Sequence, residues 1–220
     1  MKSNGIMTRG RLAVVLIIVI LLIDQAIKIW VKTHMDIGES IHVAGDWFQL
    51  HFIENNGMAY GMQIGSKLLL SIFRLVAIIL LSIYIWQQAK KKARWGYIVC
   101  LAMILAGAAG NLIDCMFYGI IFGGYAPFMM GRVVDMFYFP IIHATWPDWM
   151  PIWGGQNFTF FSPVFNFADA SISVGVIVLL LFFRKELSKL SLKGERNVDV
   201  TKNSEKTDLT ENCEKTEPTE

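Results

Sequence analysis

Long apolar stretches alternate with short polar ones along this chain of 220 residues, and four of the apolar stretches are about twenty residues long. They cover roughly residues 12–31, 67–86, 97–117 and 164–183. About 20 helical residues cross about 30 Å of hydrocarbon. The pattern therefore predicts four transmembrane helices. We expect the first to be an uncleaved span, because no small-x-small cleavage site stands at its end.

Positive charges indicate the orientation of these spans. Lys and Arg cluster before the first span, between the second and third, and after the fourth. The residues are Lys2, Arg9 and Arg11; Lys90, Lys91, Lys92 and Arg94; and Arg184, Lys185, Lys189 and Lys193. Clusters of this kind remain in the cytoplasm. The sequence therefore predicts two cytoplasmic termini and two outward-facing loops, at about residues 32–66 and 118–163.

The first outward loop has a different pattern of polar and apolar residues, with a period of about two. Polar and apolar residues alternate from Trp47 to Ile53, which is typical of a strand. A segment rich in turn residues, 55–61, follows it. We therefore expect a small periplasmic β-sheet.

The second outward loop is predicted to be extended and aromatic. It holds five of the six prolines and three tryptophans, Trp146, Trp149 and Trp153. An aromatic loop beside a membrane favours an interfacial cover over a site. A flexible insertion remains an alternative for residues 141–157, where we interpret His143 as a surface histidine.

Composition agrees with the spans and separates the tail from them. The chain is 54% hydrophobic with a mean hydropathy of +0.46, which indicates an integral membrane protein. Residues 1–193 carry 16 Lys/Arg and 10 Asp/Glu, a net charge of +6. Residues 194–220 carry 4 and 8, a net charge of −4. We predict a four-span membrane domain at 1–193 and a disordered, acidic cytoplasmic tail at 194–220.

The three cysteines predict no metal site and require no disulfide, since no CxxC or Cys/His spacing is present. Cys115 is a conceivable protease nucleophile, but we interpret it as a small packing residue.

Three carboxylates interrupt the apolar stretches. Helical rise places Asp24 roughly 20 Å and Asp114 roughly 26 Å above the inner face, and Asp169 roughly 8 Å below the outer face. All three then lie in the outer leaflet, where an ionisable side chain is costly and marks a functional site. Lys28 follows Asp24 by one turn and is positioned to pair with it. A fourth carboxylate, Asp135, lies just outside the third span.

Asp135 and Asp169 form the pair with the clearest chemistry. Two nearby carboxylates share one proton, so one activates a water while the other protonates the carbonyl or the leaving amine. This is peptide hydrolysis without metal, serine or cysteine. Asn111 and Asn166 are candidates to orient the pair or the scissile peptide.

Five motifs occur in order: Asp24-Gln25-x-x-Lys28, Asn55-x-Gly57-x-Ala59, Gly110-Asn111-x-x-Asp114, Val133-Val134-Asp135 and Phe165-Asn166-x-Ala168-Asp169. Together, over about residues 12–184, the chain resembles the bacterial lipoprotein signal peptidases, also called signal peptidase II. The resemblance implies that Asp135 and Asp169 are the catalytic dyad. It implies a supporting or substrate-binding role for Asp24, Lys28, Asn55, Gly57, Asn111, Asp114, Asn166 and Ala168.

The resemblance also implies the reaction and its setting. The family removes the signal peptide of prolipoproteins on the amino side of a diacylglyceryl-modified cysteine. We therefore expect a monomeric enzyme of the bacterial inner membrane, with lipid-modified prolipoproteins and membrane lipids as partners, and with no metal, cofactor or nucleic acid.

Two departures from the family pattern stand out. Many members have arginine directly after the aspartate that matches Asp114, and here that residue is Cys115. The basic contact is then absent, or Arg132 supplies it. The loop between Asp135 and Asn166 is also longer than in compact members, and the acidic tail has no evident counterpart.

Two other classes of protein are compatible with carboxylates in the membrane. A small proton-coupled transporter is one, although no internal repeat is evident and the acids share one depth. A scaffold without catalysis is the other, and it leaves the carboxylates unexplained.

Overall fold

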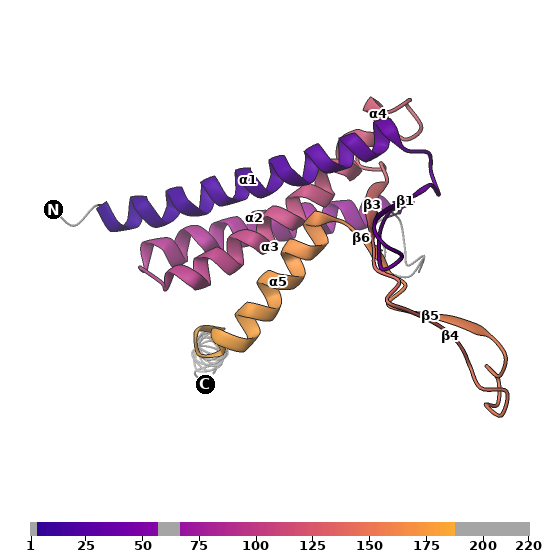
Figure 1. Ribbon diagram of the computed structural model, residues 1–220. Helices are drawn as coiled ribbons and strands as arrows, with labels where there is room; N and C mark the ends of the chain where they lie inside the picture. The colour runs from indigo at the N-terminus through magenta and orange to yellow at the C-terminus, as the bar shows by residue number, and fades with distance from the viewer. Residues whose placement is uncertain (1–3, 57–66, 188–220) are drawn as a thin grey trace, which may run out of the picture. The chain divides into compact units, whose positions relative to one another are not determined.

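Three long helices dominate the part of the chain that the computed structural model describes, which is residues 4–56 and 67–187. They are α1 (Asn4–His34), α2 (Lys67–Lys90) and α3 (Trp95–Ile113), and α3 continues through a π-helical turn, η2 (Asp114–Tyr118), into α4 (Gly119–Ile121). Figure 1 shows α1, α2 and α3 running beside one another. Three helical segments in the described residues are long and apolar enough to cross a membrane: Arg9–His34, Lys67–Lys90 and Trp95–Ile121.

The fourth apolar helix, α5 (Phe167–Phe182), is shorter than predicted. Its 16 residues rise about 24 Å, which is less than the hydrocarbon thickness of about 30 Å. The predicted span began at residue 164, but Val164 and Phe165 form strand β6 instead. The fourth crossing therefore remains a prediction. The chain divides into two compact units, Met1–Ile177 and Val178–Glu220, and the site described below belongs to the first.

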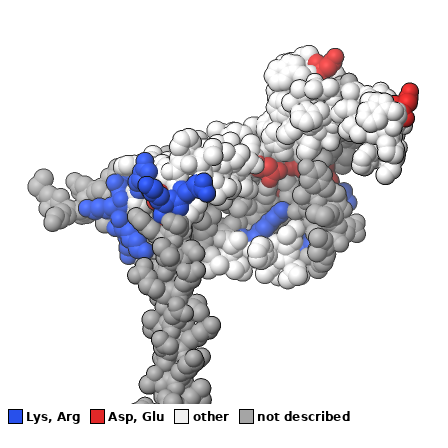
Figure 2. All heavy atoms as spheres, turned by 90° about the horizontal axis from the view of Figure 1, so that it is seen from below, with Lys and Arg blue, Asp and Glu red and all other residues white. Residues whose placement is uncertain are grey.

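The helices expose apolar side chains on a scale that favours a lipid environment over water. Leu22 of α1 and Phe73 and Leu80 of α2 are each more than 60% exposed, and many neighbouring apolar side chains are exposed too. A water-soluble protein rarely exposes apolar area on this scale. In the view of Figure 2, most of the Lys and Arg side chains lie on the left, a smaller group lies toward the right, and much of the remaining described surface carries no charge.

Small residues let helices approach α3 closely. A Cβ atom on Gly107 would lie 2.3 Å from the carbonyl oxygen of Ala168 in α5. A Cβ atom on Gly110 would lie 2.6 Å from a carboxylate oxygen of Asp24 in α1. Both glycines are therefore packing residues, since any larger side chain would displace backbone or a buried carboxylate.

A four-stranded antiparallel sheet adjoins the end of α1. Its order is β1-β2-β3-β6, and the strands are β1 (Ser40–Ala44), β2 (Phe48–Asn55), β3 (Val133–Tyr138) and β6 (Val164–Phe165). The predicted strand at 47–53 is confirmed as β2. Val31 of α1 and Met35, which directly follows the helix, pack against Phe52, Val134 and Met136 of the sheet, so this cluster connects the strands to the helix.

The segment 118–163, predicted to be an extended loop, is more structured than expected. It contains α4, β3 and a hairpin of β4 (Ile142–Thr145) and β5 (Asn157–Phe160). Its alternate positions pair Ile142 with Phe160 and Ala144 with Phe158, so one row of the ribbon is apolar. The flexible-insertion alternative is wrong for β4 and β5, because backbone pairing and the stacking of Trp146 on Phe158 order them.

Two predictions lie outside the described residues: the role of Gly57 and the disorder of the tail at 194–220.

Candidate active site

Asp135 and Asp169 are joined by two asparagine side chains. Asp135 is the third residue of β3 and is buried, whereas Asp169 lies in the first turn of α5 and is half-buried. Asn166 Nδ2 donates to Asp135 Oδ1 at 2.6 Å, and Asn111 Nδ2 donates to Asp169 Oδ1 at 2.7 Å. Asn166 Nδ2 also donates to Asn111 Oδ1 at 3.1 Å. A continuous chain of hydrogen bonds therefore connects the two carboxylates, and the predicted orienting role of both asparagines fits this geometry.

Asn166 holds its place because it caps α5. It directly precedes the helix, and its Oδ1 accepts the backbone N–H of Asp169 at 2.9 Å. This is the hydrogen bond of an N-cap residue to the third helical position, and Asn is among the preferred N-caps. Since the amide oxygen accepts from the backbone, the amide nitrogen is left to donate toward Asp135 and Asn111.

Asp135 receives a second hydrogen bond from the neighbouring strand. Asn55, the last residue of β2, donates from Nδ2 to Asp135 Oδ2 at 3.2 Å, so each carboxylate oxygen has one donor. Burial and, after it, the nearby charge of Asp169 raise the pKa of Asp135 to about 7, although both asparagine donors and Lys28 oppose the rise. Asp135 is therefore ready to hold a proton near neutral pH.

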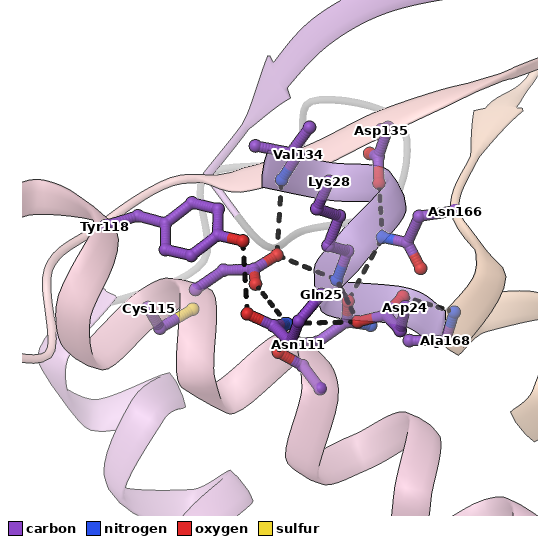
Figure 3. A network of polar contacts seen from close by, with 12 residues as sticks. Asp24, Gln25, Lys28, Asn111, Cys115, Tyr118, Val134, Asp135, Asn166 and Ala168 are labelled. Atoms are coloured by element: carbon purple, nitrogen blue, oxygen red, sulfur yellow. Dashed lines mark hydrogen bonds and ion pairs between the residues drawn. The ribbon is translucent and has the colours of Figure 1, made fainter. Parts of the chain in front are cut away.

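A buried ion cluster lies beside the pair. Lys28 Nζ is 3.0 Å from Asp24 Oδ2 and 2.8 Å from Asp114 Oδ2, and it donates to Asn111 Oδ1 at 2.9 Å. Figure 3 shows the Lys28 amine pointing into the group that contains Asp24 and Asn111. The lysine and both carboxylates are at most 1% exposed. The predicted pairing of Asp24 with Lys28 is confirmed, and the cluster carries a formal charge of −1.

Each carboxylate of the cluster also holds the backbone next to one of the paired aspartates. Asp24 Oδ1 accepts the N–H of Ala168 at 2.9 Å, and Ala168 directly precedes Asp169. Asp114 Oδ2 accepts the N–H of Val134 at 3.4 Å, and Val134 directly precedes Asp135. Lys28 therefore links the supports of both aspartates. The geometry suits the supporting role predicted for Asp24, Lys28, Asp114 and Ala168.

Sequence reasoning missed Gln25 and Tyr118. Gln25 Nε2 donates to Asp114 Oδ1 at 3.0 Å and to the carbonyl of Gly110 at 3.3 Å. Tyr118 Oη donates to Gln25 Oε1 at 3.1 Å. Gln25 stands inside a quoted motif, which was the available signal. No sequence pattern pointed to Tyr118, because it is the π-helical turn η2 that directs this side chain toward the ion cluster.

The sequence left open whether the basic contact next to Asp114 is absent or comes from Arg132. Arg132 Nη1 instead donates to Glu54 Oε2 at 3.1 Å. The cation at Cys115 comes from α2, since Arg74 Nη1 lies 3.4 Å from Cys115 Sγ. An arginine in an apolar helix was the signal for this contact. Cys115 is buried, as its interpretation as a packing residue requires, and is not positioned by any His partner in the contacts described above.

No group of three or more His, Cys, Asp or Glu side chains in residues 4–56 and 67–187 is arranged to hold a metal ion. The chemistry of the arrangement is that of paired carboxylates in a desolvated, hydrogen-bonded setting.

Comparisons with known proteins point in one direction. The sequence profile described as signal peptidase (SPase) II matches residues 16–184. A lipoprotein signal peptidase of Porphyromonas gingivalis is 47% identical over 206 residues, covering 86% of this chain and 90% of the relative. A lipoprotein signal peptidase of Amoebophilus asiaticus is 38% identical over 182 residues, covering 76% and 75%. A solved structure described as that of a bacterial membrane enzyme is 26% identical in sequence and has a TM-score of 0.57. The match covers 80% of this chain and 90% of that chain.

Proposed function

The chain belongs to the signal peptidase II family, and on this premise we propose that Asp135 and Asp169 are the catalytic dyad of an aspartic endopeptidase that removes signal peptides from prolipoproteins. Membership of a peptidase family argues against the transporter alternative. The single observation that carries the proposal is the hydrogen-bonded chain from Asp135 through Asn166 and Asn111 to Asp169.

The two aspartates have different proposed roles. Asp135 has a pKa of about 7 because burial and the charge of Asp169 disfavour its ionised form, so it holds the shared proton. Asp169, half-buried and at the start of α5, is the general base. The difference in environment supports this division of acid and base.

The proposed reaction proceeds in two balanced steps. Asp169 takes a proton from water while the water oxygen bonds to the scissile carbonyl carbon, and Asp135 gives its proton to the carbonyl oxygen. The C–N bond then breaks as the leaving amine takes the proton from Asp169. A hydroxyl of the tetrahedral intermediate returns a proton to Asp135 as the new carboxyl group forms. The dyad is thereby restored.

The proposed substrate carries a diacylglyceryl group on the cysteine that follows the cleaved bond. Each buried CH₂ of an acyl chain contributes about 0.8 kcal/mol, which concentrates the peptide in the bilayer. We propose that the site lies near the outer leaflet of the bacterial inner membrane and that both termini are cytoplasmic. The apolar helices, and the Lys and Arg clusters before the first span and between the second and third, support that placement. We also propose that a monomer suffices for catalysis, because both aspartates come from one chain.

A cleavage assay tests the dyad and the lipid requirement together. Purified Asp135→Asn and Asp169→Asn variants, which keep side-chain size but cannot ionise, are compared with wild type on a lipid-modified lipobox peptide. We expect both to remain folded and to lose nearly all turnover. Near-normal turnover in either variant would refute the dyad. The same peptide without its diacylglyceryl thioether should be cleaved far more slowly, and equal rates would remove lipid recognition from the proposal.

A further inference from the structure

A second ion cluster, distinct from the one around Lys28, joins α1 to the sheet. The side chain of Glu54 in β2 is only 6% exposed and pairs with two cations. One is Lys32, near the end of α1, and the other is Arg132, which precedes β3 and lies 3.1 Å from the carboxylate. Three segments far apart in the sequence therefore meet at one carboxylate.

This cluster lies on the opposite face of the sheet from the dyad. The register of β2 and β3 pairs Glu54 with Val134 and Asn55 with Val133. Because successive side chains of a strand point to opposite faces, Glu54 shares its face with Val134, and Asn55 shares its face with Asp135. The hydrogen bond from Asn55 to Asp135 agrees with this alternation. Glu54 and Asn55, which are adjacent in β2, therefore take part in contacts on opposite faces of the sheet.

Aromatic rings enclose the cations of the cluster. Lys32 Nζ lies 5.9, 5.2 and 5.3 Å from the ring centroids of Phe52, Phe122 and Tyr125. The Arg132 guanidinium carbon lies 5.4 Å from the Tyr125 ring, and the Arg132 backbone N–H donates to Tyr125 Oη at 2.9 Å. Cation–π contacts and the hydrogen bond restrict both cations to one arrangement around Glu54.

Stability alone gives a weak reason for such a cluster. Desolvating a carboxylate and its cations costs about as much as their attraction returns, so apolar residues of similar volume would stabilise the fold as well. The β2–β3 ladder is interrupted before this end of the strand. Its register is irregular between Leu50 and Ile53, so the last three pairs, from Ile53 to Asn55, form a short stretch separated from the rest of the ladder. The ion cluster at Glu54 adds a side-chain anchor to this short stretch.

We propose that Glu54 is a positioning residue for the dyad: held by Lys32 and Arg132, it fixes the end of β2 so that Asn55 reaches Asp135. This inference rests on the proposed function. Glu54 contacts neither aspartate and acts through Asn55. The geometry links the outer end of α1 to one oxygen of the proposed catalytic acid.

The proposal predicts a change in pH dependence that a purely structural role would not produce. The hydrogen bond from Asn55 favours the ionised form of Asp135, and the other groups that act on this carboxyl are Asp169, Lys28 and Asn166. Loosening β2 removes that bond and raises the pKa of Asp135. Since the ionisation of Asp135 ends activity on the alkaline side, the alkaline limb should move to higher pH.

The test compares Glu54→Gln with wild type in the full-length protein, on the lipid-modified peptide. The matched control is Glu39→Gln, because Glu39 is an exposed glutamate whose side chain accepts a local backbone N–H, that of Asp36, at 2.8 Å. We expect kcat of Glu54→Gln to fall about tenfold with KM within about twofold, because a small misplacement of a catalytic group is costly. The alkaline limb should rise by about half a pH unit to one unit, the effect of one hydrogen bond. The control should match wild type.

A folded Glu54→Gln protein with wild-type kcat and a wild-type alkaline limb would overturn the proposal, and so would a change in KM alone. If Glu54→Gln does not fold, Glu54→Asp takes its place, because the shorter side chain keeps the charge but reaches both cations poorly. A kcat several-fold below wild type with the same shift of the alkaline limb is expected, and wild-type behaviour of that variant would reject the inference.

Asp135→Asn and Asp169→Asn in the same assay separate the two proposals. If either retains turnover, the dyad itself is refuted. If both are inactive while Glu54→Gln behaves as wild type, only the positioning role of Glu54 is refuted.

Discussion

Replacing Lys28 by methionine should lower the free energy of unfolding more than almost any other single substitution. Methionine keeps much of the volume but removes the cation that lies 3.0 Å from Asp24 and 2.8 Å from Asp114. The formal charge of the buried cluster changes from −1 to −2. Removing one partner of a buried ion pair costs about 3–5 kcal/mol, because the remaining charge stays desolvated. The loss of the donor to Asn111 adds to that cost.

The magnitude can be measured by chemical or thermal unfolding in detergent. A loss of about 3–5 kcal/mol corresponds to a fall in Tm of about 10 °C for a chain of this length. The matched control is Lys91→Met, because Lys91 is an exposed lysine beyond the end of α2. It should change stability by less than about 0.5 kcal/mol.

A second variant identifies the cause of the loss. Adding Asp24→Asn and Asp114→Asn to Lys28→Met removes both unpaired charges, so the triple variant should regain much of the lost stability while remaining impaired in cleavage. Non-additivity of this kind is expected for groups in one network. A cost below about 1 kcal/mol for Lys28→Met, or a triple variant less stable than the single one, would refute the reasoning.

Three further outcomes are expected. Gly110→Ala should greatly reduce stability and cleavage, because its Cβ atom would lie 2.6 Å from a buried carboxylate of α1. The control Gly10→Ala, whose Cβ atom would meet nothing within 4 Å, should change neither. Unfolding curves and turnover measurements check both variants. Asp135→Asn should be more stable than wild type at pH 8, by about 4 kcal/mol, because the wild-type carboxyl ionises near pH 4 when unfolded but only near pH 7 when folded. That gain should vanish as the pH falls to about 4, and a constant difference in unfolding free energy across this range would contradict it. Cysteines introduced within 118–163 should react with an impermeant reagent added outside intact cells and those within 88–95 should not, and the reverse pattern would overturn the orientation.

Much of the site was predictable because its residues stand in short ordered motifs. Asp24 and Lys28 are one helical turn apart, so their pairing follows from local geometry. Asn166 precedes a helix, and its capping bond to Asp169 is equally local. Asn111 of α3 and Asp114, which begins η2, belong to one quoted motif, and a spacing of three helical residues places them on one face. Local periodicity and spacing were sufficient for each of these.

Other features depended on contacts that no local pattern encodes. Arg74 lies at Cys115, and Arg132 does not, because the packing of α2 against α3 decides which cation is within reach. The start of α5 was misplaced because Phe165 pairs with Phe137 of β3, a partner 28 positions earlier. A pairing of that kind competes with helix formation only once the sheet exists.

The sequence by itself determined the apolar helices, the strand at β2 and the identity of the paired aspartates, since lipid exposure, strand alternation and ordered motifs are written in consecutive residues. Only the tertiary structure decided how Asp24 reaches the backbone of Ala168, 144 positions away, and how Glu54 meets Lys32 and Arg132. Hydrogen bonds and ion pairs are short-ranged and directional. They form only where the packing of helices and the register of strands bring distant residues to within about 3 Å.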